Sequence, residues 1–233
     1  MLPNSEDQAP PRPQFVQYLG LRIDPAWRKL APAARAEGRS LFARVVEDAA
    51  PEVTTYTYST LGLKVGCDLM LWRKSDSPVP MQEMTSQMLL AGLGTYLEPS
   101  HSLFGFTRPS TYTRRPTTQE QAIDVEDRCT YMIVYPFSKT TEWYLMSKEA
   151  RQGMMNEHMR IGHEYADVRQ VLLYATGLDD QEFVVAYETD DLVRFQSLVI
   201  DLRATEARRY TLRDTPILTG IHRHLRDALA LLG

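Results

Sequence analysis

The sequence predicts the same order of secondary structure twice, and this repetition constrains the fold more than any other feature. In the first half, the patterns indicate a strand, a helix, two strands and a helix at residues 15–23, 24–50, 53–60, 67–74 and 80–97. In the second half, strands at 129–137, 168–176 and 182–188 alternate with a helix after Ser147 and a helix at 190–208, before a last block of a strand and an amphipathic helix at 210–233. Both halves therefore follow a β-α-β-β-α-β order, which is ferredoxin-like.

This order predicts an α+β protein made of two ferredoxin-like halves packed sheet to sheet, an architecture of the dimeric α+β barrel type. We place the halves at residues 14–106 and 128–233, joined by a connector at 107–127 that is rich in Thr, Pro and Arg. Residues 1–13 hold four prolines and no apolar run, so we expect a disordered tail and neither a secretory signal nor a membrane anchor.

Polar residues mark the expected starts of three helices. Asp24 precedes a proline at the first helical position, Ser147 precedes the helix of the second half, and either Asp190 or Asp191 precedes the helix at 190–208.

Composition narrows the possible functions. The net charge of -4 argues against a nucleic-acid-binding protein, and no window has the roughly 18 consecutive apolar residues that span a membrane. Cys67 and Cys129 lie far apart and are flanked by strand-like residues, which is typical of buried thiols in a reducing compartment. The motifs HExxH, CxxC, GxGxxG and the Walker loop are absent. We therefore expect a cytoplasmic enzyme or binding protein.

The helix after Ser147 carries a histidine in its apolar stripe. Met154, His158, Ile161 and Tyr165 recur at helical spacing, so we expect them on one buried face. His158 is then either a core histidine bonded to a backbone carbonyl or a single axial ligand to haem iron. Gly162, one turn further on, has no side chain to keep a flat molecule from the helix. Spacing alone leaves both interpretations open.

A long set of ordered motifs surrounds this helix. The segments YPFSKTTEWYLMSKEARQGMMNEHMRIGHEY, VRQVLLYATGLDDQEFVVAYE and LRATEARRY contain Tyr-Pro-x-x-Lys, Trp-Tyr, Met-x-x-x-His-x-x-x-Gly, Gly-Leu-Asp-Asp and Arg-x-x-Glu. Over roughly residues 128–220 the chain resembles the chlorite dismutase family, and within it the coprohaem decarboxylases. The resemblance implies that the first half is free of haem, that His158 is the proximal iron ligand, and that subunits form a ring, often a homopentamer.

The resemblance also implies roles for residues around the porphyrin. Tyr135 matches the tyrosine that becomes a radical in the decarboxylases, and Lys139 matches a lysine that holds propionate carboxylates. Trp143 matches a tryptophan that lines the pocket, and Arg203 matches an arginine that binds the substrate. Arg208, which stands where some members have serine, is a further candidate for binding the propionates.

Two questions about the surroundings of His158 are left open by the sequence: which residue lies on the distal side of the haem, and what Glu206 does. Chlorite-decomposing members carry an arginine on the distal side of the haem, and here alignment gives Gln170, with Arg169 beside it. Only one of two neighbouring strand residues can face the pocket, and we favour Gln170 because burying an unpaired guanidinium costs more free energy. Glu206 is a candidate for hydrogen bonding the outer nitrogen of His158.

These residues lead to one preferred function and two alternatives. The preferred function is haem synthesis, in which hydrogen peroxide oxidatively decarboxylates two propionates of iron coproporphyrin III, the substrate and redox cofactor, to give haem b. A chlorite dismutase would need Arg169 as the distal group. A haem-binding carrier or sensor without turnover would be favoured if the porphyrin binds but Tyr135 points away from it. We expect no nucleic acid or membrane partner, and we expect at most a transient contact with a ferrochelatase.

Overall fold

A computed structural model gives the structure of the chain, and it describes residues 13–112, 123 and 125–233. The tail expected at 1–13 and much of the connector expected at 107–127 lie outside the described residues. In the first half the elements are β1 (Phe15–Ile23), the 3-10 helix η1 (Pro25–Lys29), α1 (Pro32–Asp48), β2 (Thr54–Lys64), β3 (Cys67–Ser75), α2 (Pro78–Leu90), η2 (Gly92–Tyr96) and β4 (Leu97–Phe106).

The second half repeats this order with additions. Its elements are β5 (Tyr131–Lys139), α3 (Thr141–Leu145), α4 (Lys148–His163), β6 (Arg169–Tyr174), β7 (Phe183–Thr189), α5 (Leu192–Arg203), η4 (Glu206–Tyr210), β8 (Thr211–Arg213), β9 (Leu218–His222) and α6 (Leu225–Ala230). The final block therefore contains two strands, where the sequence predicted one.

The helix predicted over 24–50 is broken. Asp24 caps only the short η1, by accepting a hydrogen bond from the Ala26 amide at 2.7 Å, and α1 starts afresh at Pro32. A residue before proline is disfavoured in the helical region, and Ala31 is accordingly extended. Of the two alternatives at the start of α5, Asp191 is the cap and Asp190 instead accepts hydrogen bonds from Thr130.

The strands form one closed sheet. Its order is β7-β6-β4-β1-β3-β2-β9-β5-β8, and a further antiparallel pairing of β7 with β5 closes the ring, with β8 beside the end of β5. The halves join through β2 with β9 and β4 with β6. The expected α+β class and barrel type are confirmed, but the halves join through pairing of their edge strands where packing of one sheet on the other was expected. This pairing covers the edges of the strands in the ring, and β8 lies at the end of the strand order beside β5.

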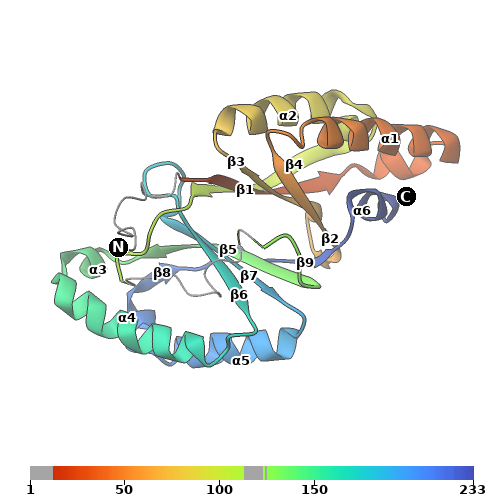
Figure 1. Cartoon of the computed structure of the whole chain (residues 1–233). Helices are drawn as coiled ribbons and strands as arrows, with labels where there is room; N and C mark the ends of the chain where they lie inside the picture. The colour runs from red at the N-terminus through yellow and green to blue at the C-terminus, as the bar shows by residue number, and fades with distance from the viewer. Residues whose placement is uncertain (1–12, 113–122, 124) are drawn as a thin grey trace, which may run out of the picture.

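Helices cover two opposite sides of this barrel (Figure 1): α1 and α2 lie on one side, and α4 and α5 lie on the other. Within the described residues, none of the helices combines the length and apolarity that crossing a membrane requires. Cys67 and Cys129 are both free and buried, as expected.

The barrel interior is mostly apolar but contains a buried ion pair that the sequence did not reveal. The side chains of Arg128 and Glu188 are 1% and 3% exposed and lie 3.1 Å apart. The Arg128 guanidinium lies 4.6 Å from the ring centroids of both Tyr56 and Trp72, and the Tyr58 hydroxyl donates to Glu188 at 3.0 Å. Burial raises the pKa of Glu188 although Arg128 opposes this. The carboxylate therefore depends on its cation to stay ionised.

We predict that Arg128→Met lowers the free energy of unfolding by about 3–5 kcal/mol, because it leaves a buried carboxylate without its cation. The loss should be smaller at pH 5 than at pH 7.5, since Glu188 without its cation can be protonated at low pH. Urea unfolding at both pH values measures this. The control Arg226→Met breaks the exposed pair with Glu47, 2.8 Å long, and should cost less than about 1 kcal/mol. Equal losses in the two variants would contradict the prediction.

Candidate haem site

The candidate site lies between the outer face of the barrel and the helix α4. Ser147 caps this helix by accepting a hydrogen bond from the Ala150 amide at 3.2 Å, as expected. The expected buried stripe is wrong in one respect, because none of the sixteen residues of α4 is buried. Met154, His158 and Ile161 are only half-buried, and Tyr165, just beyond the helix, is buried.

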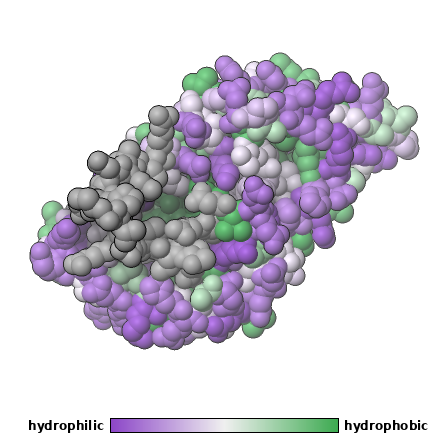
Figure 2. All heavy atoms as spheres, viewed as in Figure 1, coloured by the Kyte–Doolittle hydropathy of each residue, from purple (hydrophilic) through white to green (hydrophobic). Residues whose placement is uncertain are grey.

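The two helical layers differ in how fully protein side chains fill them. Eighteen buried residues form the cluster beneath α1 and α2; fifteen come from the first half, including Met81, Met84 and Met88 of α2, and three come from the C-terminal end of the chain. The cluster beneath α4 and α5 has five buried residues. The outer surface over α4 and α5 is mostly hydrophilic in this view (Figure 2), so these helices turn polar side chains outward. That inner face is suited to contact a flat apolar ligand.

His158 is neutral and lacks a hydrogen bond. Burial, and secondly the charge of Lys139, lower the pKa of His158 to about 4, with Glu157 opposing. The Nδ1 atom is buried and has no hydrogen-bond partner. Glu206, considered as a partner for the outer nitrogen, instead pairs with Arg209 at 3.2 Å. The first of the two interpretations from the sequence, a core histidine hydrogen-bonded to a backbone carbonyl, therefore does not describe the Nδ1 atom of this side chain.

The opposite wall of the site is a row of aromatic side chains on β5 and β7. The ring centroids of Tyr135 and Tyr187 are 6.0 Å apart with 29° between the planes, and those of Phe137 and Phe183 are 4.9 Å apart with 16° between them. Burial raises the pKa of Tyr135, and a hydrogen bond with Tyr187 acts in the opposite direction. The two phenol groups therefore lie in hydrogen-bonding contact. The sequence analysis did not identify Tyr187. The alternation of β7 could have done so, because residues two apart in a strand share a face and Val185 is on the face toward the helices.

The register of β6 places Gln170 and Arg169 on opposite faces. Gln170 pairs with Tyr187, and directly opposed residues point to the same side of a sheet. Gln170 therefore faces the helices, like Tyr135. Arg169 pairs with Glu188, whose side chain points into the barrel, and the Arg169 Nη1 donates to the Asp127 carbonyl at 2.7 Å.

Cationic side chains gather at one end of the site. The Lys139 ammonium lies 4.5 Å from the Trp143 ring centroid, and its pKa is lowered to about 8 by burial and then by the charge of Arg208, while Glu182 opposes this. Trp143 is 3% exposed, on α3. Arg203 and Arg208 share a single carboxylate, at 3.2 and 2.6 Å. That carboxylate belongs to Asp214, which sequence analysis did not identify because it lies in a loop outside every motif.

Comparisons with known proteins agree with this geometry. The profile of the family described as chlorite dismutase matches residues 35–223. The chain belongs to the chlorite dismutase family. A curated relative, the coproheme decarboxylase of Mycolicibacterium smegmatis, is 34% identical over 176 residues, which are 75% of each protein.

Solved structures of the family have the same fold. A mutant chlorite dismutase from Candidatus Nitrospira defluvii superimposes with a TM-score of 0.86 at 26% identity, covering 94% of both chains. The structure of the chlorite dismutase from the same organism in complex with imidazole gives the same values. The family binds haem and contains oxidoreductases of more than one kind.

The residues of this chain fit the haem of its family. A neutral imidazole is the form of histidine that ligates iron, and burial keeps His158 in that form. At Gly162, an added Cβ would meet no atom within 4 Å, so the helix surface beside His158 is open. The apolar and aromatic wall from β5 and β7 supplies a second face for a flat ring system.

The low pKa of His158 predicts a pH dependence of stability in the ligand-free protein. The unfolded chain binds a proton at His158 below about pH 6.5, whereas the folded chain does so only near pH 4. The contribution of neutral His158 to the free energy of unfolding is therefore fully present above pH 6.5. It is lost as the pH falls toward 4, by up to about 3 kcal/mol. Chemical denaturation between pH 7 and 4 measures this.

In the variant His158→Leu, stability should fall less steeply over the same range. His163→Leu, on the exposed side of α4, serves as the control and should keep the wild-type slope. If His158→Leu and wild type lose stability in parallel, the protonation of His158 is not the cause.

Proposed function

We propose that this protein is a coprohaem decarboxylase that converts iron coproporphyrin III to haem b with hydrogen peroxide. The observation that carries the proposal is the face of the barrel on which Tyr135 and Gln170 lie together, with Arg169 on the other face. A chlorite dismutase of this family requires a distal cation, and the site-facing residue of β6 is a neutral amide. The relative named coproheme decarboxylase supports the same choice.

His158 and the surface beside Gly162 would hold the porphyrin, and Trp143 would line its edge. When bound, iron coproporphyrin supplies an iron that reacts with peroxide and the two propionates that are decarboxylated. In each round, one propionate side chain loses carbon dioxide and two hydrogen atoms and becomes a vinyl group. One hydrogen peroxide accepts those two electrons and two protons and gives two waters, so the reaction balances without another reductant or oxidant.

Tyr135 is suited to carry a hydrogen atom. Burial raises its pKa, so it remains a phenol at neutral pH rather than a phenolate. Its hydrogen leaves as a proton and an electron, and the resulting radical takes a hydrogen atom from a propionate side chain, which restores the phenol. The hydrogen bond between Tyr135 and Tyr187 holds the Tyr135 phenol in place.

Lys139, Arg203 and Arg208 would bind the propionate carboxylates. The three cations share few acidic partners within the described residues: Asp214 pairs with both arginines, and a Glu182 oxygen accepts a hydrogen bond from the Lys139 amide at 2.7 Å. A bound carboxylate would offset the mutual repulsion that lowers the pKa of Lys139. Arginine binds carboxylate with two parallel hydrogen bonds, which also orients the substrate.

From the family resemblance we also propose a homopentamer in the cytoplasm that meets a ferrochelatase transiently. Sedimentation of the purified protein measures the subunit number.

The function is tested by incubating the protein with iron coproporphyrin III, adding peroxide stepwise and following the product mass. We expect two successive losses, each of one carbon dioxide and two hydrogen atoms, and no release of dioxygen from chlorite. Release of dioxygen from chlorite without any mass loss would favour a chlorite dismutase. Porphyrin binding without either reaction would favour a carrier.

A tyrosine pair gives a sharper test of the proposed radical. Tyr135→Phe should bind iron coproporphyrin with an unchanged absorption spectrum but lose decarboxylation by about 100-fold or more, as for the removal of a positioned proton-transfer group. The matched variant Tyr187→Phe keeps the Tyr135 phenol and removes one hydrogen bond, so its rate should fall by about tenfold or less. Full activity in Tyr135→Phe would exclude the radical role.

A further inference from the structure

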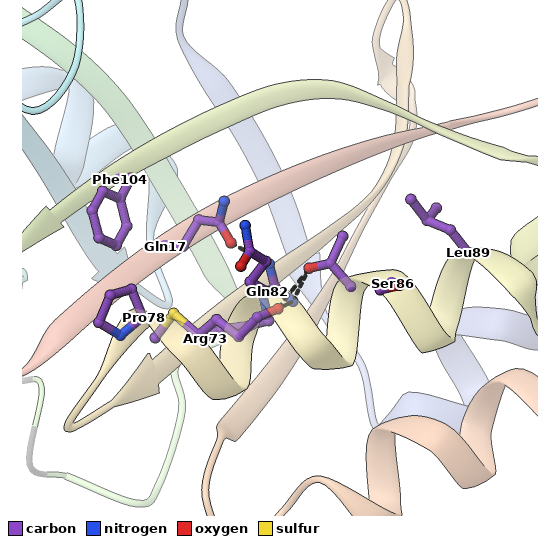
Figure 3. A pocket seen from close by; sticks show the side chains of 9 residues that line it. Gln17, Arg73, Pro78, Gln82, Ser86, Leu89 and Phe104 are labelled. Carbon is purple, nitrogen blue, oxygen red and sulfur yellow. Dashed lines mark hydrogen bonds between the residues drawn. The ribbon is translucent and has the colours of Figure 1, made fainter.

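A cavity lies on the opposite side of the barrel from the candidate haem site. It is a groove of about 480 Å³ between α2 and the outer face of β1, β3 and β4. Figure 3 shows the side chains that line it. Three of them, Phe104, Gln17 and Arg73, are direct neighbours across adjacent strands, and Met81, Thr85 and Leu89 come from α2.

Arg73 is the unusual residue of this groove. It is only 1% exposed, and its Nη1 donates to the Met81 carbonyl at 3.1 Å and to the Thr85 hydroxyl at 2.8 Å. Its Nη2 donates to the side-chain oxygen of Gln17. All three acceptors are neutral, and the Nε atom is buried without a hydrogen-bond partner. Across the described part of the chain, Arg73 forms no ion pair with a carboxylate.

Arg128, the other buried arginine described above, differs from Arg73 in having a carboxylate partner, and this difference indicates that Arg73 can accept an anion. Both arginines are buried, but Arg128 has Glu188 at 3.1 Å, whereas Arg73 has only dipoles around it. Burial lowers the pKa of Arg73 to about 10, which still leaves it charged at neutral pH. A guanidinium has five N–H donors, and three of them are used, so the Nε–H and one Nη2 hydrogen of this buried group have no acceptor among the described residues.

The lining restricts the chemistry of that ligand. A single cation with two free donors matches one carboxylate, whereas a phosphate dianion would leave an excess negative charge in a poorly hydrated site. The rest of the wall is largely apolar, with Met81, Leu89, Phe104 and Pro78. A groove of this volume falls in the range of small-molecule sites.

We propose that the Arg73 groove binds an amphipathic monocarboxylate, with the carboxylate on Arg73 and the apolar body along Met81, Leu89 and Phe104. The site is separate from the haem site and does not depend on the function proposed for it.

The test uses the full-length protein without porphyrin and sodium decanoate as the probe, with calorimetric titration and thermal unfolding as readouts. Decanoate should bind at least about tenfold more tightly than decanol, which has the same tail without the charge, and should raise the unfolding temperature. Sodium sulfate at equal ionic strength should give no such shift. Equal binding of decanol, or an equal shift with sulfate, would overturn the proposal.

Variants separate this groove from the cations of the haem site. Arg73→Met should weaken decanoate binding at least about tenfold, while Lys139→Met should leave it unchanged. Arg22→Met, at an exposed arginine paired with Glu98, is a control for removing a positive charge. Undiminished binding in Arg73→Met, or lost binding in Lys139→Met, would overturn the assignment.

A second variant guards against misfolding of Arg73→Met. Gln82→Trp changes an exposed α2 residue that lines the groove, so it should fold normally and still obstruct decanoate. If decanoate binds this variant as it binds wild type, the groove is not the site. Sedimentation of Arg73→Met is also informative, because a reduced oligomeric mass would assign the groove to a contact between copies of the chain and overturn the ligand proposal.

Discussion

Closure of the sheet into one barrel is the constraint on which the rest of the structure depends. In a closed barrel, one face of every strand packs inward and the other is left for helices or ligands. On β5, Met132 and Val134 fill the barrel, so Tyr135 must face outward. On β6 the same rule turns Arg169 toward Glu188 and Gln170 toward the helices. The polarity of the candidate site thus follows from the register of one strand.

Each side of the barrel is covered by its own layer of helices, and the two layers serve different purposes. Beneath α1 and α2, large side chains such as Trp27, Phe42 and Met88 are fully buried and fill the layer with protein. Beneath α4, the contacts are sparse and the helix buries none of its own residues. Much of the hydrophobic stabilisation of this fold therefore comes from the first half and the barrel interior, which leaves α4 free to be selected for binding rather than packing.

Patterns among neighbouring residues predicted much of this structure, but contacts between residues far apart in the sequence were not predicted. The strand at residues 15–23, the cap at Ser147 and the alternation around Tyr135 depend on neighbours in the chain, so the sequence shows them. The pairing of Arg128 with Glu188 and the shared use of Asp214 by two arginines join residues that no periodicity connects. The sequence predicted a barrel-type fold but not the pairing of β2 with β9 and of β4 with β6, because which edge strands pair is decided in three dimensions.

The balance of charges links the candidate haem site with the Arg73 groove. Where this chain needs a buried cation for structure, it supplies a carboxylate, as Glu188 does for Arg128. That balance is incomplete in two places: Lys139 and two arginines share few acids at the candidate haem site, and Arg73 in the α2 groove has no ion pair in the described residues. For a buried cation without an ion pair, such as Arg73, the desolvation cost is several kcal/mol, and an anionic ligand would offset it on binding. The number of uncompensated cations limits the charge of a ligand, which agrees with the several propionates proposed for the candidate haem site and the single carboxylate proposed for the Arg73 groove.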